Sequence, residues 1–480
     1  MRTSTIGNWT WRIVAVAASL LALVLGLRIL QSERQPDLKP WHTWAPPEAD
    51  ADEIDEFDWA AWLAREDTLM KDMRAHMAES LEAADRVAAN RYFDGSPLYS
   101  ARFAQDWNRS YELLPAAAPV GAVVLLHGLS DSPYSLRHVA LAYVSRGYAA
   151  IGLRLPGHGT VPAGLTRAHW QDWRAATRLA MREARRVAGA GKPIHVVGYS
   201  NGGALALQYT LDAVSGSKLD VPARVVLVSP MIGLTRFARY AGIAGWPALL
   251  PRFSKTAWLD IVPEFNPFKY NSFPVNAARQ SYELTQQIDG ALRTAVERGT
   301  IARLPPVLAF QSVVDSTVAG EAVVGTLFAR VPDNGSELVL FDVNRATPFD
   351  LLLSPGAQGR LEQMLPSGAQ RYRITVIGNV PGDNSVSETS RLPGTSSGVV
   401  RRLGLPYPPS FFSLSHVALP FPPSDSLYGT DPDDEDYGVH LGSQAPRAER
   451  GTLINGADTL VRASCNPFFD YMRERIEEGL

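Results

Sequence analysis

The chain is poor in cysteine: Cys465 is the single one among 480 residues. One cysteine excludes an intrachain disulfide and any metal site built from cysteines alone. The chain also lacks an excess of one charge, because 46 Lys and Arg stand against 49 Asp and Glu, for a net charge of −3. Nucleic-acid-binding proteins usually carry a basic surface, so we expect no nucleic-acid partner.

Lysine is scarce too, while alanine, proline and glycine are abundant, a bias typical of high-GC coding that favours a bacterial source. The hydrophobic fraction of 46% and the charged fraction of 20% are ordinary for a globular protein with a core. The length exceeds one typical domain, yet a large α/β domain with insertions can reach it.

One long apolar run lies near the N-terminus. Residues 13–27 carry no charge, and Ile29 and Leu30 extend the run to about 18 residues, near the lower limit for crossing a bilayer. No small-residue cleavage site follows, as a signal peptide would require. We therefore expect residues 1–30 to be an uncleaved membrane anchor.

The charges around this run indicate its orientation. Arg2, Arg12 and the amino terminus precede the run without an intervening acid, although Arg28 lies on its other side. Under the positive-inside rule this favours an N-terminus inside and the rest of the chain on the outer, periplasmic side.

Composition divides the rest of the chain into three parts. Residues 31–60 are rich in proline and acids and are expected to be a weakly ordered linker. Residues 61–110 are expected to be a helical extension, because apolar residues at spacings of three and four predict a helix from about 61 to 90. Residues 111–480 then hold the main domain.

In this domain, short apolar strands alternate with helices. Strands are expected within 111–115, 122–128, 149–153, 193–198, 224–230, 305–315, 336–343 and 371–380, with helices at 166–187 and 203–214 between them. Such alternation predicts a mostly parallel sheet flanked by helices, an α/β fold. Two stretches interrupt it: an apolar, aromatic-rich insertion at about 231–304, interpreted as a cap, and an insertion at about 345–410.

The five residues Gly198-Tyr199-Ser200-Asn201-Gly202 match G-x-S-x-G. An expected strand ends at Gly198 and an expected helix begins near Gly203, so Ser200 lies in the tight turn between them. This is the context of a nucleophile elbow, where small neighbours let the chain turn sharply and expose the hydroxyl. We therefore interpret Ser200 as a catalytic nucleophile rather than a helix-capping serine.

A serine nucleophile also needs donors for the oxyanion that its attack produces. The main-chain N–H groups of Asn201, directly after the nucleophile, and of Leu129, in the loop after an earlier strand, are the candidates. His127 in the same loop is interpreted as a structural brace.

Several segments together resemble the α/β-hydrolase superfamily, and within it the monoacylglycerol lipase, carboxylesterase and serine aminopeptidase-like group. They are His127-Gly128, "LRLPGHGTVP" (153–162), "GYSNGG", "LAFQSVVDSTV" (308–318) and "SHVALPF" (415–421). The resemblance implies hydrolysis of an ester or amide through an acyl-enzyme, by a Ser–acid–His triad in that chain order. It implies neither a metal nor an organic cofactor.

The resemblance assigns the acid to Asp315, which follows a strand and precedes Val318. Asp289, within an expected helix, and Asp342, within an expected strand, have the wrong context. The family often has glycine where Ser312 stands.

The base is assigned to His416, about a hundred residues after Asp315, with residues 345–410 looping out in between. His440 is the other histidine after the acid, and its acidic neighbours indicate a surface position.

Three functions remain open on these residues. The first is a serine carboxylesterase or lipase acting on a small-molecule or lipid ester, favoured by the aromatic-rich cap and the anchor. The second is a peptidase or amidase using the same triad, in which an acid of the cap such as Glu264 would bind a substrate amino group. The third is a catalytically silent, membrane-tethered binding protein.

Overall fold

The computed structural model describes residues 4–233, 245–315, 317–346, 359–380, 382–409, 411, 413–432, 435–442 and 464–480. Ten strands of the described chain form one sheet in the order β1-β3-β2-β4-β5-β8-β9-β10-β11-β12. They are β1 (Tyr111–Leu113), β2 (Gly121–Leu126), β3 (Tyr148–Leu153), β4 (Ile194–Tyr199), β5 (Arg224–Val228), β8 (Val307–Ser312), β9 (Glu337–Phe341), β10 (Arg373–Asn379), β11 (Ser385–Arg391) and β12 (Val399–Pro406). The pairs from β3 to β10 are parallel, while β1, β11 and β12 pair antiparallel.

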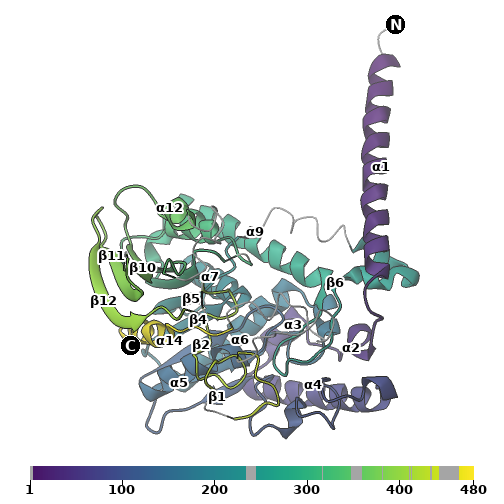
Figure 1. Cartoon of the computed structure of the whole chain (residues 1–480), viewed down its shortest axis with the longest axis horizontal. Helices are drawn as coiled ribbons and strands as arrows, with labels where there is room; N and C mark the ends of the chain where they lie inside the picture. The colour runs from purple at the N-terminus through teal and green to yellow at the C-terminus, as the bar shows by residue number, and fades with distance from the viewer. Residues whose placement is uncertain are drawn as a thin grey trace.

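Helices cover both faces of this sheet (Figure 1). In β2, Val124 and Leu126 point to the layer of α6 (Trp170–Ala188), α7 (Asn201–Val214) and α9 (Val275–Glu297). Val123 and Leu125 point to the layer of α5 (Arg137–Ser145) and α14 (Phe469–Glu477). Strands buried on both faces read as continuous apolar runs, and the predicted α/β fold class is confirmed.

The remaining described elements are short apart from two. The long ones are α1 (Ser4–Glu33) and α4 (Trp59–Ser80). The short ones are α2 (Pro40–Thr43), α3 (Ala51–Glu56), η1 (Ala83–Asp85), η2 (Ser100–Arg102), η3 (Pro133–Leu136), η4 (Pro162–Thr166), η6 (Trp246–Leu249), η7 (Pro251–Ala257), β6 (Trp258–Asp260), β7 (Phe273–Pro274), η8 (Thr300–Arg303), α10 (Gly320–Ala322), η9 (Val323–Phe328) and α12 (Arg360–Met364).

Residues 31–60 differ from the expected weakly ordered linker. Trp41, Ile54 and Trp59 are buried, and Asp50 caps α3 by accepting the N–H groups of two following residues. Glu48 pairs with the fully buried Arg154 at 2.8 Å. Acids of this segment therefore act as a helix cap and as an ion-pair partner. Composition alone cannot distinguish such acids from acids that are simply exposed to solvent.

The helix expected at 61–90 is α4, which ends at Ser80. Its apolar stripe packs inward through Leu69, Met73 and Met77, whereas Val87 beyond the helix is 49% exposed. Glu66 on α4 is fully buried and contacts Arg154 at 3.0 Å, which fixes the helical extension to the end of β3.

The two insertions also differ from expectation. Within the first, residues 234–244 lie outside the described part; α9 packs through Ala277, Leu284 and Ile288 into the main core, so it belongs to a layer of the domain rather than to a cap. Within the second, residues 347–358 lie outside the described part, and β10, β11 and β12 extend the sheet instead of looping out (Figure 1). The side-chain amide of Asn344 donates to the carbonyl of Phe411 at 2.8 Å, which joins the two ends of this excursion.

Candidate active site

Ser200 stands between the end of β4 and the first residue of α7. Its backbone has φ 54° and ψ −114°, a conformation that costs energy for a residue with a side chain. Strand, strained serine and helix follow one another without a spacer. This is the geometry of a nucleophile elbow, in which the turn projects the hydroxyl away from the sheet.

The glycines of the motif are required by close contacts. A Cβ at position 202 would lie 1.9 Å from the carbonyl oxygen of Leu126, and one at position 198 would lie 2.3 Å from that of Gly202. Both distances are far below van der Waals contact. The two glycines therefore let α7 cross the ends of β2 and β4 directly behind the serine.

Asp315 is the third residue after β8 and is 8% exposed. One carboxylate oxygen accepts the N–H groups of Thr317 at 2.8 Å and Val318 at 3.1 Å. The other accepts the side-chain amide of Gln311 at 2.9 Å. Three donors thus hold this carboxylate, and together they fix its orientation.

His416 is the further partner of that carboxylate. Its Nδ1 lies 2.8 Å from Oδ2 of Asp315, across 101 residues of sequence. Burial opposes the charged form of Asp315, but the hydrogen bond and charge of His416 and the two N–H donors outweigh it, and its pKa lies below the ordinary value. With Nδ1–H given to the carboxylate, Nε2 is the nitrogen left to act as a base.

The histidine lies beside the elbow. The hydroxyl of Tyr199, the residue before Ser200, donates to the carbonyl of His416 at 3.4 Å, and the two rings are 5.3 Å apart between centroids. The structure therefore brings His416 to the strand end next to Ser200, although the two residues are more than two hundred positions apart in the sequence.

Ser312 holds the segment that carries the histidine. Its hydroxyl donates to the carbonyl of Leu414 at 2.8 Å, two residues before His416, and it is 1% exposed. A glycine at this position would lack that bond. The residue that departs from the family pattern thus compensates for the long route by which the histidine arrives.

A buried carboxylate fixes the same segment from its other side. Asp425, fully buried, accepts hydrogen bonds from Arg137 at 2.6 Å, Tyr134 at 3.0 Å and His138 at 3.0 Å. Burial raises the pKa of Asp425, but Arg137 and His138 overcome this and hold it well below the ordinary value. This ion pair joins the stretch after His416 to η3 and α5.

The two candidate oxyanion donors lie close to the serine. A Cβ on Gly128 would lie 3.3 Å from the Cβ of Ser200, so the loop that carries Leu129 passes directly against the nucleophile. Asn201 is the first residue of α7, where N–H groups have no intrahelical acceptor. Among the described residues, neither the N–H of Leu129 nor that of Asn201 donates to another main-chain group.

His127 supports this loop. Its Nε2 accepts the N–H of Leu155 at 3.0 Å, so the proton is on Nδ1, which donates to the carbonyl of Gly128 at 2.8 Å. Burial and the neighbouring His158 hold the pKa of His127 well below its usual range, so the ring stays neutral. The geometry is that of a brace.

The rejected candidates lie in other settings. Asp289 pairs with Arg293 on α9, Asp342 with Arg345, and His440 contacts the carbonyl of Ser426 and Asp436 with 43% of its side chain exposed. Glu264 is buried, and its two carboxylate oxygens accept main-chain N–H groups at 3.0 and 2.8 Å.

Two residues near the site escaped the sequence analysis. The first is Gln311, which orients Asp315. The second is Asp131, which is 4% exposed in the loop after Leu129 and interacts electrostatically with Lys269 and His416. Burial raises the pKa of Asp131 to about 6, against the opposing pull of Lys269. An acid three residues after a His-Gly turn was the available signal.

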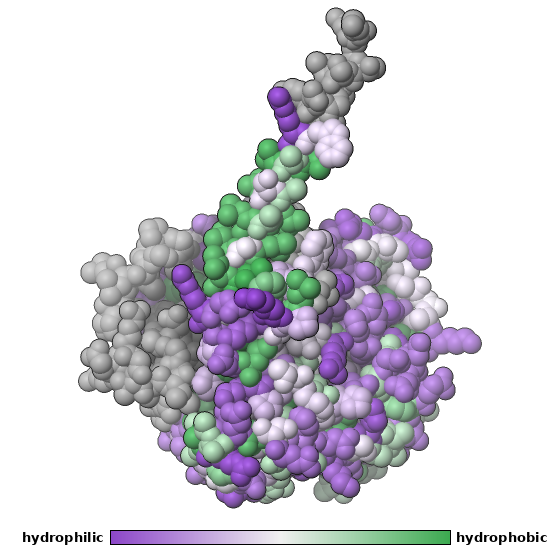
Figure 2. Space-filling view, turned by 90° about the vertical axis from the view of Figure 1, so that its right-hand side faces the viewer, coloured by the Kyte–Doolittle hydropathy of each residue, from purple (hydrophilic) through white to green (hydrophobic). Residues whose placement is uncertain are grey.

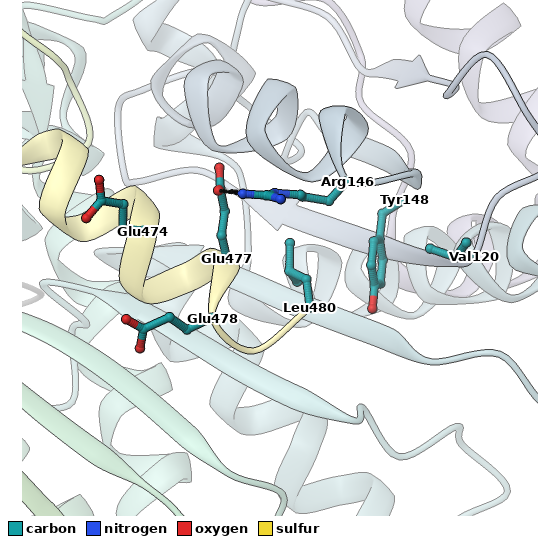
Figure 3. A pocket seen from close by; sticks show the side chains of 7 residues that line it. All are labelled: Val120, Arg146, Tyr148, Glu474, Glu477, Glu478 and Leu480. Carbon is teal, nitrogen blue, oxygen red and sulfur yellow. Dashed lines mark hydrogen bonds and ion pairs between the residues drawn. The ribbon is translucent and has the colours of Figure 1, made fainter.

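A surface cavity of about 730 Å³ lies elsewhere (Figure 3). Val120 and Tyr148, which line it, stand at the starts of β2 and β3, and Glu477 of α14 pairs with Arg146 at 2.5 Å across it. Ser200 follows the opposite end of the parallel strands, so this cavity is not part of the candidate site.

Comparison with known proteins agrees with this architecture. Residues 123–360 match the model of the alpha/beta hydrolase family.

A relative of established activity, the thermostable monoacylglycerol lipase of Bacillus sp. (strain H-257), is 30% identical over 175 residues, which are 36% of this chain and 65% of that protein. The chain thus spans just under two thirds of the length of that relative. A solved structure from work on LipS and LipT, two metagenome-derived lipolytic enzymes, is 19% identical with a TM-score of 0.40, covering 54% of this chain and 97% of that one. A soluble variant of the Saccharomyces cerevisiae monoglyceride lipase is 18% identical with a TM-score of 0.37, covering 48% and 81%.

Proposed function

We propose that this chain is a serine hydrolase that cleaves carboxylic esters, with Ser200 as nucleophile, His416 as base and Asp315 as the acid that orients the base. The observation that carries the proposal is the 2.8 Å hydrogen bond between Asp315 and His416, formed beside a strained serine elbow. The hydrogen bond from the Tyr199 hydroxyl to the carbonyl of His416 supports placing this pair beside Ser200, where a base could activate the serine hydroxyl.

The reaction follows from these positions. Nε2 of His416 takes the proton of Ser200 as its oxygen attacks the ester carbonyl, and Asp315 stabilises the imidazolium. The N–H groups of Leu129 and Asn201 bind the oxyanion; losing one such donor costs on the order of a hundredfold or more in rate. His416 then returns the proton to the leaving alcohol, and water releases the acyl group from Ser200 by the same route.

The substrate proposed is an apolar or lipid-like ester. The resemblance to a monoacylglycerol lipase supports an ester with an acyl chain. The amidase alternative loses its candidate amine ligand, because both carboxylate oxygens of Glu264 are used by the N–H groups of Asn271 and Ser272.

The N-terminal helix is proposed to be a retained membrane anchor. Trp11–Glu33 is long and apolar enough to cross a membrane, a property it shares with signal sequences. Its end is packed on the body: Arg28 and Ser32 are buried there, which cleavage after the helix would undo. The charges of Arg2 and Arg12 support placing the hydrolase on the periplasmic side.

Labelling with a fluorophosphonate tests the triad in the full chain in detergent micelles. We expect Ser200→Ala to abolish labelling and His416→Ala to reduce it by about a thousandfold or more, since triad members act as a unit. His440→Ala is the matched control and should label like the wild type. Loss in His440→Ala with retention in His416→Ala would reassign the base. A folded wild type that does not label would favour a catalytically silent binding protein.

A further inference from the structure

The lower end of α1 is docked on the segment 245–260. The guanidinium of Arg28 donates to the carbonyl of Trp258 and, at 3.5 Å, to that of Thr256. Further along the chain, the side-chain amide of Gln35 donates to the carbonyl of Leu259 at 2.9 Å. Lys255 of η7 donates to the carbonyl of Gln35 at 3.1 Å. The helix is therefore held in a defined direction rather than attached by a flexible tether.

The free part of the helix is too short to cross a bilayer by itself. The uncharged stretch begins at Ile13, and side chains are exposed on every side only as far as Val24, a length of about 18 Å at 1.5 Å per residue. The hydrocarbon core is about 30 Å thick. The apolar stretch approaches that thickness, at about 27 Å, only when it is counted down to Leu30, beside the docked segment.

The outer side of the docked turns remains apolar. Leu27 is 57% and Leu30 63% exposed, although Arg28 between them is buried against the body. On the body next to them, Trp246 is 55%, Leu250 59% and Leu259 38% exposed. Figure 2 shows the apolar colour of the helix continuing onto the body around its base.

We propose that Trp246, Leu250 and Leu259 form, with the last turns of α1, one membrane-contacting surface that enters the boundary between the headgroups and acyl chains of the bilayer. The proposal rests on the retained anchor of the proposed function. The occupant is a lipid leaflet because the surface continues the membrane-spanning helix and the hydrocarbon thickness requires the leaflet to reach it. A tryptophan at this depth fits the aromatic enrichment of membrane interfaces.

This surface is linked to the candidate active site. The same stretch of chain continues to Tyr270, whose N–H donates at 2.7 Å to the carbonyl of Ser130, next to Leu129. The segment that carries the membrane-contacting surface therefore contacts the loop that carries Leu129.

Depth measurement on the full chain in phosphatidylcholine vesicles tests the proposal. An environment-sensitive fluorophore is attached to the cysteine of the Leu250→Cys variant. The control is Leu141→Cys, which is 50% exposed on α5, a helix that lies away from α1 in Figure 1. The native Cys465 is buried, which limits its labelling. We expect a blue-shifted emission, quenched by nitroxide-labelled lipids, at position 250 and neither effect at 141. An unshifted, unquenched label at 250 in protein that floats with the vesicles would overturn the docking while leaving the anchor intact.

Activity provides a second readout. Trp246→Ser with Leu250→Ser should lower hydrolysis of a long-chain monoacyl ester in vesicles by about tenfold, since buried apolar area is lost. Hydrolysis of a short water-soluble ester should stay unchanged, as it should for Leu141→Ser with both substrates. An equal loss on both substrates would overturn the proposal, because the pair would then act on the chemistry. Absence of all hydrolysis in the wild type would instead contradict the proposed function.

Discussion

Buried aspartates around the candidate site differ in pKa according to their partners. Asp315 and Asp425 are buried beside His416 and Arg137, and the pKa of each lies below the ordinary value. Asp131 is equally buried, but its carboxylate accepts the N–H of Ser132 rather than a cationic donor, and its pKa is about 6. Burial disfavours the charged form in all three, and the hydrogen bonds and charges of close partners reverse the direction for Asp315 and Asp425.

The raised pKa of Asp131 predicts a pH-dependent cost. Above its folded-state pKa, the carboxylate is charged in both states but costs more in the folded one, so wild-type stability falls as pH rises from about 4 to 6. Asp131→Asn should therefore raise the free energy of unfolding at pH 8 by about 2–3 kcal/mol, from 1.36 kcal/mol per pKa unit. The gain should fade below about pH 4. Urea unfolding at both pH values measures it, with the exposed Asp470→Asn as control; a lower stability at pH 8 would contradict the assignment.

The hydroxyl of Ser312 is predicted to position His416 through Leu414. Ser312→Ala removes a buried hydrogen bond and leaves a carbonyl unpaired, a cost of about 1–3 kcal/mol. We expect kcat to fall about tenfold with little change in KM, because the base loses its place while substrate contacts remain. Ser281→Ala is the matched control, since its buried hydroxyl on α9 has no partner among the described residues. Equal kinetics for the two variants would show that Ser312 does not position the base.

At the scale of elements, the extension β10–β12 separates the candidate acid from the candidate base. The sequence predicted β10 from its apolar run, but not β11 and β12. Ser385–Arg391 is mostly polar, and every residue of β12 is exposed or half-buried, so neither strand shows the continuous apolar pattern of the central sheet. β11 is placed by pairing with β10 and β12 by pairing with β11, and such pairing is a tertiary effect that local pattern does not contain.

The candidate site also combines residues that the local sequence indicates with residues whose positions depend on tertiary contacts. Ser200 could be proposed from the local pattern of strand, turn and helix, whereas Asp315 was assigned by the family resemblance, which expects the acid after a strand. His416 needed the family resemblance, since its position depends on Ser312, Asp425 and the closed ends of the insertion, contacts that span long sequence distances. No sequence motif marked Gln311 as a partner of Asp315, because the two side chains meet only where the chain turns after the end of β8.

Because β12 lies at the edge of the sheet, we expect it to unfold locally while the central strands stay folded. It has one partner strand, and Val399 and Val400 are 67% and 63% exposed, whereas β4 is buried between β2 and β5. Hydrogen exchange should show amides of β12 exchanging at least about a thousandfold faster than those of β4, because little buried surface opposes local opening. Equal protection of the two strands would indicate that another surface covers the edge.

At the scale of the whole molecule, the N-terminal extension, residues 31–110, packs into the core of the α/β domain. Ile54 and Trp62 are fully buried in the same cluster as the strands β2 and β3. Arg154 is fully buried and its guanidinium is paired with Glu48 and Glu66, both outside the sheet. The extension thus supplies apolar surface to the core, and it also supplies the two carboxylates that compensate the charge of the buried Arg154.

Two truncations separate the anchor from this extension. A chain beginning at residue 34 loses α1 and keeps both carboxylates, so it should still unfold cooperatively in urea. A chain beginning at residue 111 lacks both carboxylates that pair with Arg154 and uncovers the apolar face under α4. We expect it to aggregate or to lose its cooperative transition. Glu66→Gln in the full chain isolates the charge, and it should lower the urea midpoint where the exposed Glu362→Gln does not. A chain from residue 111 that unfolds at the full-length midpoint would mean that the α/β layers are stable alone.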